Sequence, residues 1–344
     1  MVKMRRQLFV LIFVVFTMSC IFLITSIFST YGNRIFKPRD FMIQLPQTRP
    51  LPITKESVNL TDGVHTYYLN LSRFQEEIPF LQDYQCSLTL TPSGRFQDRP
   101  SLLILAIKSH PASGARRTAL RQTWATEREV KGFWVKPIFL MAQDANPRRM
   151  ELVKLESREF GDILQWDFTE SHHNLSLKER CFLEWLHHHL PQVEFIFKGD
   201  DDEYVNPYAV VQYIKHHGSS PFILHGNLQR HSAVMRQYKY RVSENLYPHP
   251  VYPYFLSGGG FLFPGRSVKL LYEESQRIPV FPLDDVYFGF LGLAANLTYR
   301  HDSRFHVSGL AFKACRYQRA LVVHGINPEQ MVKIHNEAQN ALCK

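Results

Sequence analysis

Between residue 100 and the C-terminus, short apolar runs alternate with longer segments of helical pattern. The apolar runs that we expect to be strands are Leu102–Ile107, Val135–Met141, Ile163–Trp166, Phe195–Phe197 and Ile223–Leu228. The segments between the first four are expected to be helices over residues 113–126, 146–160 and 174–190, the last opened by a capping box at Ser176–Glu179. Continuous apolar runs are typical of strands that are covered on both faces. The pattern therefore predicts an α/β fold in which a mostly parallel central sheet carries helices on both faces.

Three aspartates, Asp200–Asp202, follow the strand expected at Phe195–Phe197, and Asn206–Pro207 then opens a helix. The carboxyl ends of strands are where open α/β sheets bind ligands. Adjacent carboxylates repel one another, and a divalent cation bound by Asp200 and Asp202 would relieve that repulsion. Oxygen ligands of this kind suit Mg2+ or Mn2+. The alternative is a solvated acidic turn, and these residues alone do not decide between the two.

A second acidic pair, Asp284-Asp285, opens a later predicted helix. One carboxylate suits an N-cap and the other a general base, although both would also serve as caps and surface charges. Gly258–Gly260 precedes an apolar strand, which indicates a tight turn or the close approach of a ligand. His324 ends the strand expected at residues 320–324, and a lone histidine is more often a packing residue than a ligand.

The predicted helix over residues 113–126 carries a group of basic side chains directly after the first strand. Its arginines are Arg116, Arg117 and Arg121. A strand followed by a basic helix suits an anion, but an ordinary exposed basic face is the alternative.

The N-terminal residues predict a membrane anchor. Residues 1–7 carry Lys3, Arg5 and Arg6. Residues 8–28 form an uncharged stretch that is long enough for a spanning helix and is apolar except for Thr17, Ser19, Thr25 and Ser26. A cleaved signal peptide is the alternative, but its apolar region is typically shorter, and no clean cleavage site follows. The charge distribution predicts a cytoplasmic tail (1–7), a signal anchor in the lipid bilayer (8–28), a proline-containing luminal stem (29–99) and a main domain (100–344).

Composition agrees with a globular luminal protein. The chain has 344 residues, of which 45% are hydrophobic and 21% charged. Its net charge of +9 comes from scattered residues, and together with the anchor this argues against a nucleic-acid partner. Four N-glycosylation sequons begin at Asn59, Asn70, Asn174 and Asn296. Outside the apolar stretch lie Cys86, Cys181, Cys315 and Cys343, which allow three disulfide pairings.

Five motifs in this order resemble the Golgi β-1,3-glycosyltransferases, which have a GT-A fold. The motifs are Arg116–Trp124, Phe197–Asp202, Gly258–Phe261, Leu283–Val286 and Val322–His324. The resemblance covers residues 100–344 and fits a type II membrane protein with a luminal catalytic domain. The glycine-rich segment and the sequence around Asp284 and Asp285 resemble the β-1,3-N-acetylglucosaminyltransferase branch most.

The resemblance implies a role for each candidate residue. Asp200, Asp202 and His324 would hold Mn2+ or Mg2+ on the diphosphate of a UDP-sugar. The donor would also contact Lys108, Arg117, Arg121 and Asp201, and Gly258, Gly259 and Gly260 would line the donor and acceptor pocket. Asp285, beside Asp284, would be the base of an inverting transfer.

The implied reaction joins N-acetylglucosamine from UDP-GlcNAc through a β-1,3 linkage to a galactose-terminated glycoprotein or glycolipid. UDP-galactose is the alternative donor, and an inactive luminal paralogue with a binding role is the alternative to an enzyme.

Two departures from the family pattern concern the site and the cysteines. Glu203 stands where family members usually have an apolar residue, and it adds charge beside the metal site. Phe290–Leu291 stands where the family tends to have a cysteine, which implies that Cys315 pairs with Cys343 and Cys86 with Cys181.

Overall fold

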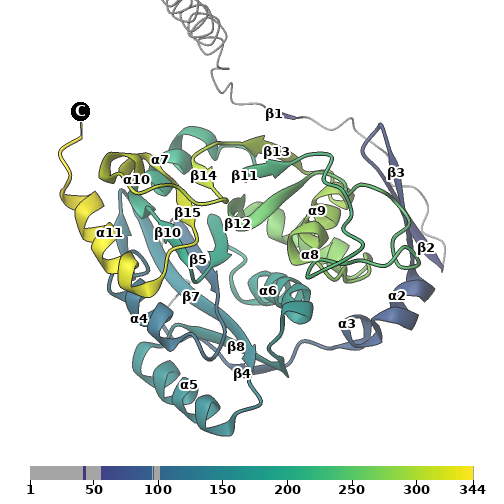
Figure 1. Ribbon diagram of the computed structural model, residues 1–344, viewed down its shortest axis with the longest axis horizontal. Coiled ribbons are helices and arrows are strands. Elements are labelled where there is room, and N and C mark those ends of the chain that lie inside the picture. The colour runs from purple at the N-terminus through teal and green to yellow at the C-terminus, as the bar shows by residue number, and fades with distance from the viewer. Residues whose placement is uncertain (1–41, 44–55, 95, 97–100, 344) are drawn as a thin grey trace, which may run out of the picture. The chain divides into compact units, whose positions relative to one another are not determined.

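The computed structural model describes residues 42–43, 56–94, 96 and 101–343, and in these ranges a ten-stranded sheet forms the centre of the protein (Figure 1). Across the sheet the strands are β1 (Met42–Ile43), β13 (Thr298–His301), β11 (Ile223–Gln229), β12 (Phe255–Pro264), β9 (Phe195–Asp200), β5 (Leu102–Lys108), β7 (Phe133–Gln143), β8 (Ile163–Thr169) and β4 (Leu88–Leu90), with β6 (Arg128–Val130) paired to β7.

The sheet is mixed, so the prediction of a mostly parallel sheet is wrong. Strands β9, β5, β7 and β8 are parallel to their neighbours in that series, but β12 runs antiparallel to both β9 and β11. The edge strands β1 and β4 are also antiparallel to their partners. A strand buried on both faces has the same continuous apolar run in either direction, so the sequence pattern does not reveal strand direction.

Helices cover both faces of the sheet, as predicted. Side chains of β5 alternate between two cores, with Leu103, Leu105 and Ile107 in one and Leu102, Ile104 and Ala106 in the other. The first core is closed by α4 (Gly114–Arg121), α5 (Pro147–Phe160), α7 (Pro207–His217) and α11 (Pro328–Asn340). The second is closed by α6 (Leu175–His189), α8 (Val268–Ser275) and α9 (Asp284–Ala294).

A small three-stranded sheet lies beside the main one. It pairs β10 (Glu203–Val205) with β15 (Val322–His324) and β15 with β14 (Phe305–His306). Of these three strands only β15 was predicted, because it alone overlaps a continuous apolar run, residues 320–323. The short helices η1 (His172–Asn174), η2 (Gly265–Ser267) and α10 (Ala314–Arg319) complete the fold.

Residues 56–94 belong to the folded unit, which corrects the stem predicted over residues 29–99. They form β2 (Ser57–Thr61), β3 (Thr66–Asn70), α2 (Leu71–Glu77), α3 (Pro79–Asp83) and β4. Leu69 and Phe74 are fully buried in the same core as α9. These elements are short and are separated by polar and proline residues, so each contains too few apolar positions to show a periodic pattern in the sequence.

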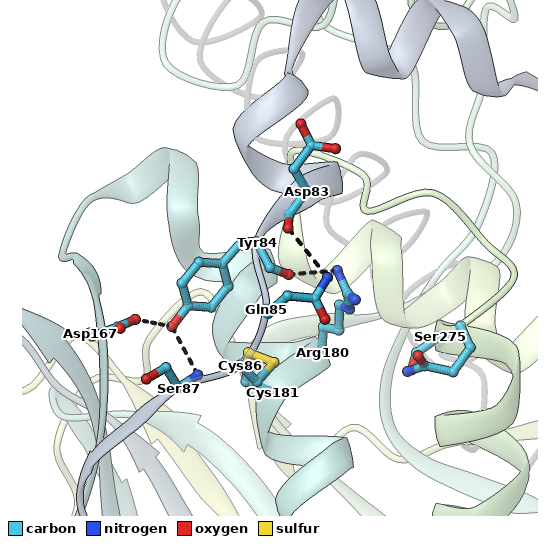
Figure 2. The surroundings of a disulfide bond; sticks show 10 residues. Asp83, Tyr84, Gln85, Cys86, Ser87, Asp167, Arg180, Cys181 and Ser275 are labelled. Carbon is cyan, nitrogen blue, oxygen red and sulfur yellow. Dashed lines mark hydrogen bonds between the residues drawn. A yellow bond between two sulfur atoms is a disulfide. The ribbon is translucent and has the colours of Figure 1, made fainter.

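A disulfide fastens this segment to α6. Cys86 is bonded to Cys181, and Cys315 is bonded to Cys343, which is the pairing that the resemblance implied. Beside the first bond, the Tyr84 hydroxyl donates a hydrogen bond to Asp167, and Arg180 donates one to the Tyr84 carbonyl (Figure 2).

Two further predictions concern helix α6 and the N-terminus. The prediction of a capping box at Ser176–Glu179 is wrong, because Asn174 is the N-cap of α6 and Ser176 is buried within the helix. The tail and anchor predicted over residues 1–28 lie outside the described residues. Within the described ranges, no helix has both the length and the apolar character needed to cross a bilayer.

We expect Phe74→Ala to destabilise the protein by about 3–5 kcal/mol, because it removes a fully buried ring from the core. Phe80→Ala on the adjacent helix α3 is the matched control, since that ring is half exposed and its loss should cost less than about 1 kcal/mol. Denaturant unfolding measures both. Equal stability of the two variants would contradict the folded structure of residues 56–94 and favour the predicted stem.

Candidate active site

A single cavity of about 920 Å³ collects most of the predicted site residues. It opens at the carboxyl ends of β5 and β9 and at the start of α9. Its lining includes Lys108, Asp200, Asp201, Asp202, Gly258, Gly259, Asp284, Asp285 and His324. The two acidic motifs are more than eighty residues apart in the sequence, and the fold places them on the walls of one cavity.

Lys108 connects the two acidic motifs. The parallel register of β5 and β9 sets Lys108 beside Asp200, and its Nζ lies 3.1 Å from Asp200 Oδ1 and 2.8 Å from Asp284 Oδ2. Burial opposes the charged form of this lysine, but the two carboxylates outweigh it and raise the pKa of Lys108 well above its usual value. The predicted donor contact is therefore an internal counterion of both acidic pairs.

Asp284 and Asp285 have opposite electrostatic environments. Burial raises the pKa of Asp284, but the charges of Lys108 and Lys198 outweigh it and lower that pKa below its usual value. Burial and the charge of Asp284 raise the pKa of Asp285 to about 6. Leu283 rather than either aspartate is the N-cap of α9, so capping does not explain the pair. Two carboxylates with pKa values moved apart are typical of acid–base chemistry.

The metal candidates Asp202 and His324 lie together. Asp202 Oδ1 is 3.5 Å from His324 Nε2, and burial raises the pKa of this carboxyl. That oxygen is buried and has no hydrogen-bond partner among the described residues. A buried carboxylate oxygen beside an imidazole fits a divalent cation, which would satisfy both.

Asp201 is anchored rather than free to meet a donor. Its carboxylate accepts hydrogen bonds from the Ser109 hydroxyl at 2.7 Å and from Arg116 Nη1 at 2.8 Å. Arg116 also lies 3.6 Å from Asp202. Arg116 lines the cavity, although it was not among the residues predicted to contact the donor.

Arg117 and Arg121 do not line the cavity, which corrects their predicted role. Arg117 is buried and binds both carboxylate oxygens of Glu156 at 2.7 Å. Arg121 binds Glu156 and Asp162. Consecutive helical residues point about 100° apart, so Arg116 faces the cavity while Arg117 joins α4 to α5.

A second buried lysine lies near Asp284, and the sequence did not predict its place in the site. Lys198 forms an ion pair with Glu179 of α6 and lies 3.8 Å from Asp284. Burial and the charge of Lys108 lower the pKa of Lys198 to about 7. The available signal was a lysine within an otherwise apolar strand, because such a residue needs an internal partner.

Glu203 is fully buried at the start of β10, next to the metal candidates. Burial and the charge of Asp200 raise its pKa well above the usual value. Asp200, Glu203 and His324 each offer one ligand atom, and these atoms lie within 4.8 Å of one another.

Residues 115–303 match the model of a family described as Galactosyltransferase. The chain belongs to this family. The resemblance seen in the sequence motifs is thereby confirmed, and the protein is a member of a glycosyltransferase family.

Relatives in the family include transferases of two sugars. The chain is 33% identical to a mouse acetylgalactosaminyl-O-glycosyl-glycoprotein β-1,3-N-acetylglucosaminyltransferase, over 84% of this chain and 78% of the relative. It is 31% identical to human N-acetyllactosaminide β-1,3-N-acetylglucosaminyltransferase 3, over 83% and 81%. It is 32% identical to gorilla β-1,3-galactosyltransferase 5, over 76% and 90%.

We expect Arg117→Ala to lower the stability by about 3 kcal/mol or more, because it leaves the partly buried Glu156 without its bidentate partner. Arg116→Ala on the same helix should cost no more than about 1 kcal/mol, since Arg116 is considerably exposed. Thermal melting compares these neighbouring arginines. A stable Arg117→Ala variant would remove the structural role assigned to this side chain.

Proposed function

We propose that the protein is an inverting, metal-dependent transferase that moves N-acetylglucosamine from UDP-GlcNAc to the 3-hydroxyl of a galactose-terminated glycan, forming a β-1,3 linkage. The observation that carries this proposal is the raised pKa of Asp285 in the same cavity as Asp202 and His324. Two of the relatives named above are β-1,3-N-acetylglucosaminyltransferases, which favours this donor.

In this proposal, Asp200, Asp202 and His324 would hold Mn2+ or Mg2+ at the diphosphate of the donor. The cation would neutralise the charge that develops on the UDP leaving group. Arg116 takes the place of Arg117 and Arg121 as the arginine that meets the donor, because it alone of the three lines the cavity. Its guanidinium suits a phosphate oxygen, and its ion pair with Asp201 orients it.

Asp285 is the base that takes the proton from the acceptor hydroxyl during attack. A pKa of about 6 leaves this carboxylate ionised near neutral pH and makes it more basic than an ordinary aspartate. Asp284 remains ionised beside Lys108 and holds the start of α9 in place. Gly258 of β12 lies next to Asp285, since a Cβ at this position would be in ordinary van der Waals contact with the Asp285 Cβ at 3.6 Å.

The acceptor enters, on this proposal, along the side of the cavity lined by Tyr240, Tyr252 and Phe255. Tyr252 is buried against Phe281, whereas Tyr240 remains partly exposed. An exposed ring at the rim suits the apolar face of a sugar.

A second candidate is a β-1,3-galactosyltransferase that uses UDP-galactose, which the gorilla relative favours. For the cell, we propose a Golgi membrane protein of single-pass type II topology, supported by the apolar stretch at residues 8–28 and the four sequons.

The test incubates the full chain, purified in detergent, with Mn2+, UDP-GlcNAc or UDP-galactose, and β-galactoside or β-GlcNAc acceptors. We expect metal-dependent transfer of N-acetylglucosamine to the β-galactoside. Asp285→Asn should lower kcat by about 100-fold or more, because the base is lost, and leave UDP binding intact. Asp83→Asn, which changes an exposed carboxylate outside the cavity, is the matched control.

Transfer of galactose alone would contradict UDP-GlcNAc as the donor and favour the second candidate function, a β-1,3-galactosyltransferase. Absence of UDP release with every pairing would leave a binding protein, and undiminished turnover by Asp285→Asn would remove Asp285 from its role as the base.

A further inference from the structure

Glu203 shares a face of the small sheet with a proposed metal ligand. It is directly opposite His324 in the antiparallel pair of β10 and β15. Side chains of directly opposed residues project to the same side of a sheet and lie next to one another. Glu203 also follows the acidic turn that contains Asp200 and Asp202. Two separate chain segments therefore bring its carboxylate to the metal candidates.

The Glu203 carboxylate lacks partners of the kind that hold Asp201 and Asp284. Asp201 is bonded to Ser109 and Arg116, and Asp284 to Lys108. Both oxygens of Glu203 are buried, and neither has a hydrogen-bond partner among the described residues. A buried carboxylate without a partner is costly, so its presence indicates a ligand that is bound when the protein works.

The spacing of the donor atoms suits one cation. The ligand atoms of Asp200, Glu203 and His324 lie within 4.8 Å of one another. An octahedral ion with bonds of about 2.1 Å holds its ligands roughly 3–4 Å apart, so a small inward movement of these side chains would close the set. Carboxylate and imidazole donors together suit Mn2+.

Two glycines provide the space that this carboxylate occupies. A Cβ at Gly199 would lie 2.1 Å from Glu203 Oε2, and one at Gly260 would lie 3.2 Å from the same oxygen. Gly260 also has φ +101°, which favours glycine. The backbone is therefore shaped around the Glu203 side chain at this point.

We propose that Glu203 is a direct ligand of the divalent cation in this protein, together with Asp200, Asp202 and His324. This inference rests on the metal site of the proposed function and extends it. With Glu203, three carboxylates carry more negative charge than the double positive charge of the cation, so the protein holds the cation without help from the donor diphosphate. The protein therefore binds Mn2+ before the nucleotide arrives.

The test titrates Mn2+ into the nucleotide-free full chain and follows free Mn2+ by electron paramagnetic resonance. We expect Glu203→Gln to weaken Mn2+ binding at least tenfold, because a neutral amide replaces an anionic ligand. Glu129→Gln, which changes an exposed carboxylate on β6, should bind Mn2+ like the wild type. Asp202→Asn should also lose affinity and reports on the metal site of the proposed function.

Thermal melting without metal separates ligation from misfolding. Glu203→Val should melt no lower than the wild type, because it removes a buried carboxylate without a partner, yet it should lose stabilisation by Mn2+.

Wild-type affinity in Glu203→Gln, with affinity lost in Asp202→Asn, would overturn the role of Glu203 and leave the proposed function standing. Absence of Mn2+ binding by the wild type, with and without UDP, would overturn both.

Discussion

The site depends on one buried cation, the ammonium group of Lys108, which lies between Asp200 and Asp284. Without a positive charge there, carboxylates from β9 and from α9 would face one another in a partly closed cavity and would favour protonation. With it, Asp284 stays ionised, while Asp285 is left with a pKa of about 6. The contact therefore joins the proposed metal half of the site to the proposed base and also makes the two adjacent aspartates different.

Next to the contacts of Lys108, helix α6 contributes charged residues to two further buried ion pairs. Lys198 pairs with Glu179, and Lys178 pairs with Glu170 at 2.8 Å. Buried ion pairs of this kind contribute little net stability, since desolvation offsets their attraction. Their effect here is to join α6 to β9 and to the segment that follows β8. The disulfide from Cys86 to Cys181 holds the other side of α6 to the N-terminal segment.

Sequence reasoning succeeded where a residue's own neighbours determine its environment. The run Leu102–Ile107 and the acidic positions at Asp200 and Asp284 follow from such local patterns. It failed where packing decides. Arg116 and Arg117 have the same chemistry, and only the placement of α4 sends one to the cavity and the other to Glu156. The direction of β12, the fold of residues 56–94 and the partner of Lys198 likewise depend on segments distant in the sequence.

The pH dependence of kcat at saturating donor and Mn2+ tests the central claim that burial and the charge of Asp284 leave Asp285 as a base of raised pKa. A base must be ionised, so the rate should be constant near neutral pH and fall as the pH drops through about 6, approaching tenfold per unit below it. Saturating metal keeps the proposed metal site occupied at each pH compared. A rate that stays constant down to the ordinary aspartate range, near pH 4, would contradict the account.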